Sequence, residues 1–145
     1  MRNFEMPGRS PVFAANGLCA TSHPLAAQAA VRILQDGGNA VDAAIAGAVL
    51  LGFAEPQMAG LGGDCFVLLK PPGEERILAL NGSGRAPRGL DADRLRAAGA
   101  TAIGTESAEA VTVPGAVDAF CRLSAEWGRL GLADSLAPAI HYADE

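Results

Sequence analysis

The sequence is poor in the residue types that nucleic-acid-binding proteins depend on. Aromatic residues make up only 5% of the 145 residues, and eleven Lys and Arg residues face sixteen Asp and Glu residues, for a net charge of −5. The basic residues are scattered along the chain, and no aromatic side chains alternate with them to form a stacking surface. Because nucleic-acid binding needs clustered positive charge, this balance excludes DNA and RNA as partners.

Cysteine and histidine are equally scarce. Three cysteines, Cys19, Cys65 and Cys121, lie far apart with no C-x-x-C pair, so we expect free, mostly buried thiols in a reducing compartment. The two histidines are also separated. We expect His23 to cap a helix and His141 to be an exposed helical residue, and we therefore predict no metal site.

Long hydrophobic runs are missing too. The apolar run over residues 43–54 is well short of the roughly 20 residues that a membrane span needs, which favours a buried helix and no membrane partner. Residues 1–13 mix charged residues with prolines and contain no apolar core of a signal peptide. The sequence thus predicts a cytoplasmic protein.

What the chain has instead is small apolar residues. Half of its residues are hydrophobic, only 19% are charged, and the mean hydropathy is +0.21. This composition predicts a folded core and a surface that meets further polypeptide. The last predicted helix also lacks a stop signal, so we expect the chain to be cut in the middle of a larger domain.

The patterns in the first third predict an irregular arm over residues 1–13, a strand over residues 12–20 and then two helices. Asn16-Gly17 would interrupt the strand as a bulge or as a hairpin turn. The first helix has Ser22 or His23 as its cap and stops at Gly37-Gly38. The second begins at Asn39 and is apolar all round, which predicts that it is covered on every side.

The remaining patterns alternate strands and helices, so the predicted fold class is α/β (α+β). Residues 65–70 and 76–80 are expected to form an antiparallel hairpin covered on both faces. A short helix over residues 91–98, a mobile segment over 99–110 and a helix over 116–127 follow. In that helix, Val117, Phe120, Leu123 and Trp127 share one face. A last helix starts near residue 133 or 134, with Pro138 tolerable only in its first turn.

The glycine-rich turn at residues 60–63 is not a nucleotide-binding loop. The G-x-G-x-x-G pattern would need a glycine where Cys65 stands, and the turn leads into a strand instead of a helix. A hydrolytic triad built on Ser22 or Ser83 with His23 is also rejected, because no sharp strand-turn-helix elbow accompanies either serine.

Six short motifs identify a family. In chain order they read S-H-P-L-A (22–26), G-G-N-A-V-D-A (37–43), E-P-Q-M-A-G-L-G-G-D-C-F (55–66), N-G-S-G-R-A-P (81–87), V-P-G (113–115) and A-P-A-I (137–140). Together they resemble the N-terminal part of the γ-glutamyltransferase family of N-terminal-nucleophile amidohydrolases. The resemblance implies part of a four-layer αββα sandwich, a small amide substrate (γ-glutamyl or a related acyl amide), and no metal or organic cofactor.

The resemblance directs attention to Arg85. The matching loop of the family usually reads R-x-x-A-P, and its arginine binds the α-carboxylate of the substrate. Here Ser83 takes that position, and Arg85 lies two residues later, which displaces its side chain by roughly 6–7 Å along an extended loop. Arg85 either enters the substrate site from this different point or is a structural residue that hydrogen-bonds nearby carbonyls. This departure from the family's loop pattern favours relatives with other amide substrates, such as acyl-side-chain amidases or amidohydrolases of small dicarboxylic amides.

The family's nucleophile is a threonine that self-cleavage exposes at the start of a second polypeptide, beyond the matching region. Thr101, Thr105 and Thr112 do not lie in such a context. The resemblance therefore implies that residues 1–145 are the N-terminal part of a single γ-glutamyltransferase-like domain, truncated before the catalytic subunit. It implies no catalytic residue in this chain, inactivity of the chain alone, and the missing C-terminal, small-subunit portion as its partner. An alternative is a truncated, non-catalytic remnant that acts as a binding or scaffold protein.

Overall fold

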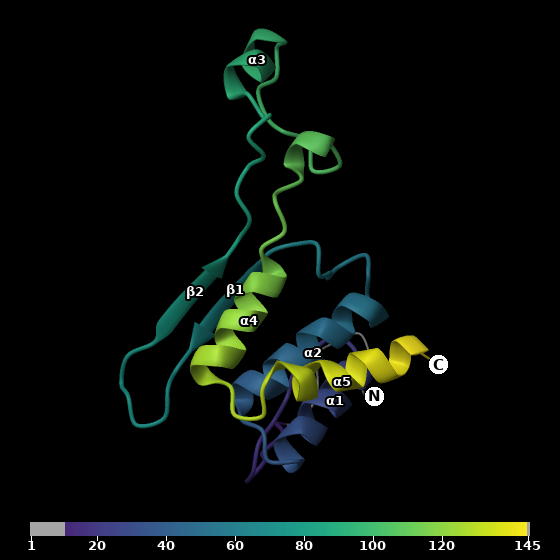
Figure 1. Ribbon diagram of the computed structural model, residues 1–145, viewed down its shortest axis with the longest axis vertical. Helices are drawn as coiled ribbons and strands as arrows, with labels where there is room; N and C mark the ends of the chain where they lie inside the picture. Colours follow the sequence, from purple (N-terminus) through teal and green to yellow (C-terminus); the bar gives the residue numbers. More distant parts are fainter. Residues whose placement is uncertain (1–10, 145) are drawn as a thin grey trace, which may run out of the picture.

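The computed structural model describes residues 11–144, so the signal-peptide prediction and most of the predicted N-terminal arm lie outside the described residues. In chain order, these residues form α1 (Pro24–Gln35), α2 (Ala40–Ala54), β1 (Cys65–Leu69), β2 (Leu78–Gly82), α3 (Ala92–Ala97), the 3-10 turn η1 (Ala108–Ala110), α4 (Ala116–Trp127) and α5 (Leu132–Asp144). Figure 1 shows α1, α2 and α5 packed together, with α4 between them and the β1–β2 hairpin.

The first described residues contradict one prediction. Residues 11–23 form no regular element, so the strand expected over residues 12–20 is wrong. A strand needs a partner for its backbone groups, and the only described sheet is the two-stranded β1–β2 hairpin. Gly17 instead adopts a φ of +151° at a point where an added Cβ would lie 2.8 Å from the Leu34 side chain of α1.

The helix boundaries in this region were predicted correctly. The Nδ1 atom of His23 accepts a hydrogen bond from the Leu25 N–H (3.3 Å), which caps α1. The chain leaves α1 through Gly37, whose φ is +96°. Asn39 and Asp42 then form the expected capping box at the start of α2, in which each side chain accepts a hydrogen bond from the backbone of the other residue.

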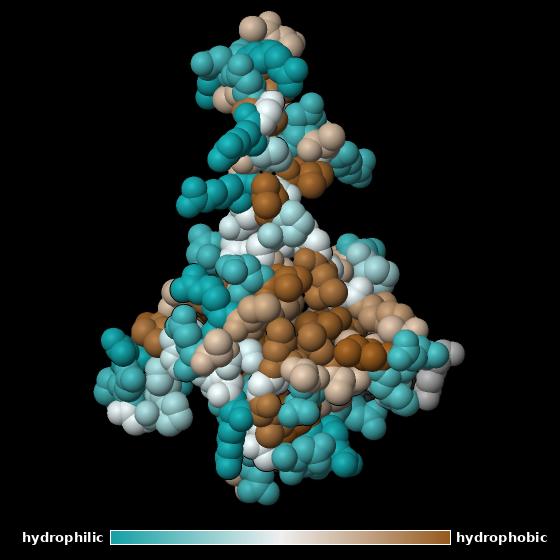
Figure 2. Space-filling model, in the orientation of Figure 1, coloured by the Kyte–Doolittle hydropathy of each residue, from teal (hydrophilic) through white to brown (hydrophobic). Residues whose placement is uncertain are grey.

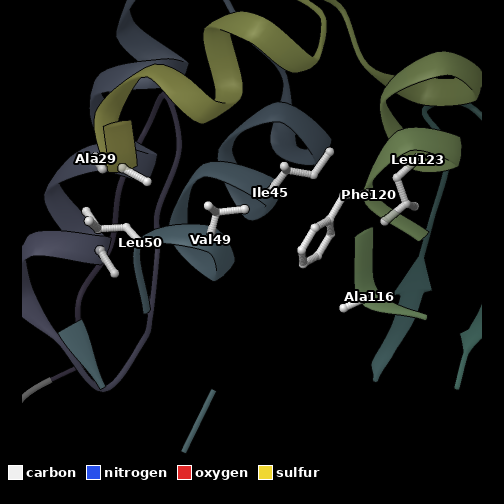
Figure 3. Close-up of a cluster of buried hydrophobic side chains, with 9 residues drawn as sticks. Ala29, Ile45, Val49, Leu50, Ala116, Phe120 and Leu123 are labelled. Atoms are coloured by element: carbon white, nitrogen blue, oxygen red, sulfur yellow. The ribbon is translucent and has the colours of Figure 1, made fainter. Parts of the chain in front are cut away.

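The core lies around α2. Ile45 and Leu50 are fully buried, and the ring of Phe120 from α4 packs against the α2 side of this cluster (Figure 3). The prediction that α2 is covered on every side is nevertheless wrong, because Ala44 and Phe53 are exposed. The described helices α1, α4 and α5 cover only part of its circumference.

The predicted hairpin is confirmed, although β2 begins two residues later than expected. Its strands are antiparallel, with Cys65 opposite Gly82 and Leu69 opposite Leu78. Two-sided coverage is wrong: one face packs towards α4, whereas Phe66 (70% exposed) and Leu68 (78% exposed) on the other face have no cover among the described residues. The continuous apolar run correctly predicted a strand. It did not show whether residues 11–144 contain a segment that covers each face of that strand.

Three helices follow the sheet. The short helix α3 and the helix α4 lie where they were predicted, although Val117 of α4 is half exposed while Phe120 and Leu123 are buried. Helix α5 begins at Leu132, so Pro138 lies inside it and not in its first turn. Placing proline there removes one helical hydrogen bond, since proline has no N–H to donate.

The observed class is therefore mixed: helices with a small two-stranded sheet. None of the helices within residues 11–144 is long and apolar enough to cross a membrane. Residues 83–115, which we call the arm, run out from the end of β2 and return to the start of α4, with α3 at the far end (Figure 1).

Candidate substrate-binding loop

Three of the sequence motifs meet at the base of the arm, although they are far apart in the chain. The glycine turn and the V-P-G turn are joined by the carbonyl of Gly63, which accepts hydrogen bonds from the N–H groups of Gly115 (3.1 Å) and Ala116 (3.0 Å). These are the first N–H groups of α4, which have no partner within the helix, so the glycine turn satisfies the start of that helix.

The loop that carries Arg85 is joined to the same place. Gly84 donates its N–H to Oδ1 of Asp64 (2.8 Å), and the Arg85 carbonyl accepts a hydrogen bond from Val113 N–H (2.9 Å). A Cβ on Gly84 would lie 1.6 Å from the backbone oxygen of Val113, so only glycine fits where these two segments of the chain approach each other. The backbone is thus fixed on both sides of Arg85.

The Arg85 side chain itself is exposed, and no hydrogen bond or ion pair connects it to another described residue. A structural role through nearby carbonyls is therefore not observed within residues 11–144. A guanidinium presents five N–H donors in a planar fork that suits a carboxylate. Its role in substrate binding stays a prediction.

Ser83, which stands where the family has arginine, is a turn residue. Its N–H donates to the side chain of Asn81 (2.9 Å), closing a turn at the end of β2. Ser83 is exposed, and its hydroxyl donates a long hydrogen bond to the Gly84 carbonyl (3.5 Å). The loop therefore has one cationic side chain from residues 81–87, and it is that of Arg85.

Asp64 is the acidic group at this junction, and the sequence reasoning missed it. Its Oδ1 accepts hydrogen bonds from Gly84 N–H and from the Thr112 hydroxyl (3.1 Å). The pKa of Asp64 is lowered, and the Gly84 N–H is the largest cause. Desolvation opposes this change, and the Thr112 and Ser83 hydroxyls lower the pKa by smaller amounts. The only sequence signal was a carboxylate directly before an apolar strand.

The other candidates do not form sites. The Ser22 hydroxyl donates to Glu55 (2.6 Å) while His23 caps α1, which agrees with rejecting a triad. His141 is exposed on α5 beside the Tyr142 ring, as predicted. The described residues contain no group of three or more His, Cys, Asp or Glu side chains placed to hold a metal ion.

The cysteines are free in the described structure. Cys19 and Cys65 are half-buried, and desolvation raises the pKa of the Cys65 thiol. Cys121 is exposed on α4, so the expectation of mostly buried thiols is wrong at that position.

Comparison with known proteins identifies the family of the chain. The sequence model of the family described as Gamma-glutamyltranspeptidase matches residues 26–145, a stretch that contains the hairpin, the whole arm and the Arg85 loop. The chain belongs to the γ-glutamyltranspeptidase family. The resemblance in its motifs is thereby confirmed.

The proteins that the chain resembles are named for different activities. The chain is 44% identical over 122 residues to the glutathione hydrolase-like YwrD proenzyme of Bacillus subtilis, covering 83% of this chain and 23% of that protein. It is 39% identical over 137 residues to the oxamate amidohydrolase proenzyme of Klebsiella pneumoniae, covering 90% of this chain and 25% of that protein.

A solved structure of the family has the same arrangement. The cephalosporin acylase from Bacillus halodurans superposes with a TM-score of 0.86 at 46% identity, covering 98% of this chain and 26% of that one. The chain therefore spans about a quarter of the length of these relatives.

Proposed function

We propose that the chain is the N-terminal portion of a γ-glutamyltranspeptidase-family amidohydrolase or transferase, in which Arg85 binds a carboxylate of the acyl substrate. The observation that carries the proposal is the Arg85 loop, fixed in its backbone by Asp64 and Val113 yet presenting an exposed, unpaired guanidinium to its surroundings within the described residues. Because the loop is already ordered, substrate binding has a smaller entropic cost.

The chemistry would be that of an N-terminal threonine supplied by the remaining polypeptide. Its hydroxyl oxygen attacks the amide carbon, its own α-amine takes up the hydroxyl proton, and that proton passes to the departing amine. An acyl-threonine ester remains. Water then attacks this ester to release the acid, or a second amine attacks it to form a new amide, which gives a ping-pong mechanism without metal or organic cofactor.

Two substrate classes are open within this proposal. γ-Glutamyl amides are the first, given the glutathione hydrolase-like relative. Ser83 in the family arginine's position favours the second, amides of other acids, and both a cephalosporin acylase and an oxamate amidohydrolase are among the similar proteins. We further propose that the full protein completes the αββα sandwich over the bare face of the hairpin and acts in the cytoplasm.

The test is to express the complete coding sequence, measure the intact mass and sequence the N-terminus of each chain. We expect a second polypeptide that begins with threonine, and turnover of at least one of γ-glutamyl p-nitroanilide, glutaryl p-nitroanilide and oxamate. Changing that threonine to alanine should abolish turnover and leave a single unprocessed chain. A lone 14.7 kDa product without activity would contradict the proposal and favour the scaffold alternative.

A further inference from the structure

The base of the arm is organised around one carboxylate. Asp64 lies at the end of the glycine turn, immediately before β1, and its Oδ1 reaches two segments that come much later in the chain. It accepts the Gly84 N–H from the outgoing side of the arm (2.8 Å) and the Thr112 hydroxyl from the returning side (3.1 Å). A single side chain thus connects both sides of the arm to the sheet.

These contacts flank the residue that is proposed to meet substrate. Gly84 precedes Arg85, and its N–H is held by Asp64. The carbonyl of Arg85 is held by Val113, the neighbour of Thr112. Without the Asp64 bonds to Gly84 and Thr112, the two sides of the arm would remain joined through Arg85 and Val113. The Gly63 carbonyl would still hold the returning side at Gly115, but no hydrogen bond would hold the outgoing side at Gly84 to the glycine turn.

We infer that Asp64 is a positioning residue for the substrate loop: it fixes the direction in which Arg85 leaves the end of β2. The inference rests on the proposed function of Arg85. A carboxylate suits this task because an ionised acceptor forms stronger hydrogen bonds than a neutral one and has lone pairs for two donors at once. Asp64 acts on the substrate only through the loop, so it is not assigned any contact with the reacting atoms.

The kinetic test uses the complete, processed protein and two probes. Glutaryl p-nitroanilide has a free carboxylate for Arg85, and pentanoyl p-nitroanilide has a similar acyl chain without one. Asp64→Ala is expected to raise the KM for the glutaryl probe by about tenfold, the effect of one lost charged hydrogen bond, with kcat and the pentanoyl KM changed less than about twofold. Asp64→Asn, which retains an acceptor oxygen, should recover part of the loss.

A double-mutant cycle separates positioning from general damage. If Asp64 acts through Arg85, Asp64→Ala should change the glutaryl KM by less than about twofold when Arg85 is already alanine. The same tenfold loss in both backgrounds, or equal losses on both probes, would overturn the inference. Asp93→Ala is the matched control, because Asp93 is an exposed carboxylate on α3 that pairs with Arg96, away from the base of the arm.

A second measurement does not depend on activity. Trypsin cleaves after Arg85 and after Arg88. The backbone at Arg85 is held to Asp64 and Val113, whereas Arg88 lies in a local turn closed by Leu90 N–H and the Pro87 carbonyl (3.0 Å), which does not involve Asp64. Asp64→Ala should raise the rate of cleavage after Arg85 several-fold relative to cleavage after Arg88, since local opening exposes the bond. Thr112→Val, which removes only one hydrogen bond, should give a smaller increase and serves if Asp64→Ala does not fold.

The two proposals fail separately. If the unmodified protein turns over neither probe, nor the other substrates named above, the proposed function fails, and the ratio of tryptic rates alone decides whether Asp64 fixes the loop. If turnover is present but the cleavage ratio is the same in the Asp64→Ala, Thr112→Val and unmodified proteins, the positioning role is wrong while the function stands.

Discussion

At the scale of single residues, Arg85 has an exposed side chain on a fixed backbone. In the complete enzyme, Arg85→Ala should raise the KM for a carboxylate-bearing substrate by the loss of about 1.5–3 kcal/mol, the scale of a charged hydrogen bond. Arg85→Lys should recover only part of this, because lysine retains the charge but not the planar fork. Unchanged steady-state kinetics in a stably folded Arg85→Ala protein would exclude the role.

The carboxylate of Asp64 gives a pH dependence. Its pKa is lowered from the ordinary value of 3.8, first by the Gly84 N–H, so the hydrogen bonds to the ionised form persist above 3.8 and are lost as the pH falls through the lower, folded-state pKa. The amide proton shift of Gly84, followed by NMR during acid titration, should change with a midpoint below 3.8. Asp64→Asn should abolish the transition, and a midpoint at or above 3.8 would contradict the assignment.

Asp42 is the buried carboxylate of the helical core. Besides capping α2, it accepts hydrogen bonds from the backbone N–H groups of Arg129 (3.0 Å) and Leu130 (3.4 Å), in the connection between α4 and α5. Asp42→Ala should lower the free energy of unfolding by about 3 kcal/mol, because it removes a buried cap and leaves these partly buried donors without partners. Urea unfolding measures this.

The matched control for Asp42 is Asp36→Ala. Asp36 forms only an exposed ion pair with Arg32, so its loss should cost less than about 1 kcal/mol. Equal losses for the two variants would mean that the Asp42 hydrogen bonds contribute nothing beyond a surface charge.

Residues that act locally could be predicted from the sequence, and those that act across the chain could not. The caps at His23 and Asn39 depend on neighbours within three residues, so spacing alone revealed them. Asp42 was predicted as part of a capping box, but its bonds to Arg129 and Leu130 join positions more than 80 residues apart. Asp64 was missed for the same reason, since its partners become neighbours only when the arm folds back.

At the scale of elements, the small residues of α2 set how closely α1 can approach. Gly47 is buried, and an added Cβ would lie 3.6 Å from the Ala26 carbonyl and 3.7 Å from the Ala30 Cβ, which is ordinary contact. Gly47→Ala should therefore stabilise the chain by about 0.5–1 kcal/mol through helix propensity.

Gly47→Leu should do the opposite. The longer side chain would overpack the interface between α1 and α2 and cost about 1–3 kcal/mol. Thermal unfolding of the two variants beside the unmodified chain measures both changes. If leucine is tolerated as well as alanine, the close approach of the two helices is wrong.

The identity of the hairpin and of the helices followed from local pattern, whereas their cover did not. Over residues 12–20 the pattern predicted a strand that these residues do not form. The apolar runs identified the hairpin and α2, and both were expected to be fully enclosed. Phe66, Leu68 and Phe53 are nevertheless exposed, because apolar composition favours burial without specifying which segment provides the cover. Helix α5 shows a different limit: its packing tolerates Pro138 inside the helix, which propensity alone would not predict.

At the scale of the whole molecule, the surface is unusually apolar. Hydrophobic residues gather on the face shown in Figure 2, and α2 and α5 border an apolar groove lined by residues that include Phe53, Leu61 and Ile140. Large apolar surfaces on a monomer promote association. Produced alone, the 145-residue chain should bind a hydrophobic dye and self-associate with rising concentration in sedimentation velocity.

Polar substitutions on the bare face of the hairpin provide the control. Changing Phe66 and Leu68 to serine should reduce both dye binding and association, because these two side chains are 70% and 78% exposed. A monodisperse, dye-silent monomer would contradict the prediction and would favour the scaffold alternative over an enzyme portion.

The closure of the arm has a consequence for redesign. Its outgoing and returning backbones meet where Val113 N–H donates to the Arg85 carbonyl (2.9 Å), so the two ends of residues 86–111 lie close together. A short turn can span such a gap, and the entropy of closing a loop changes only slowly with its length. Residues 86–111 therefore form an exchangeable module, which a hairpin turn or a grafted binding loop can replace while the helical core and the Asp64 contacts with Gly84 and Thr112 are kept.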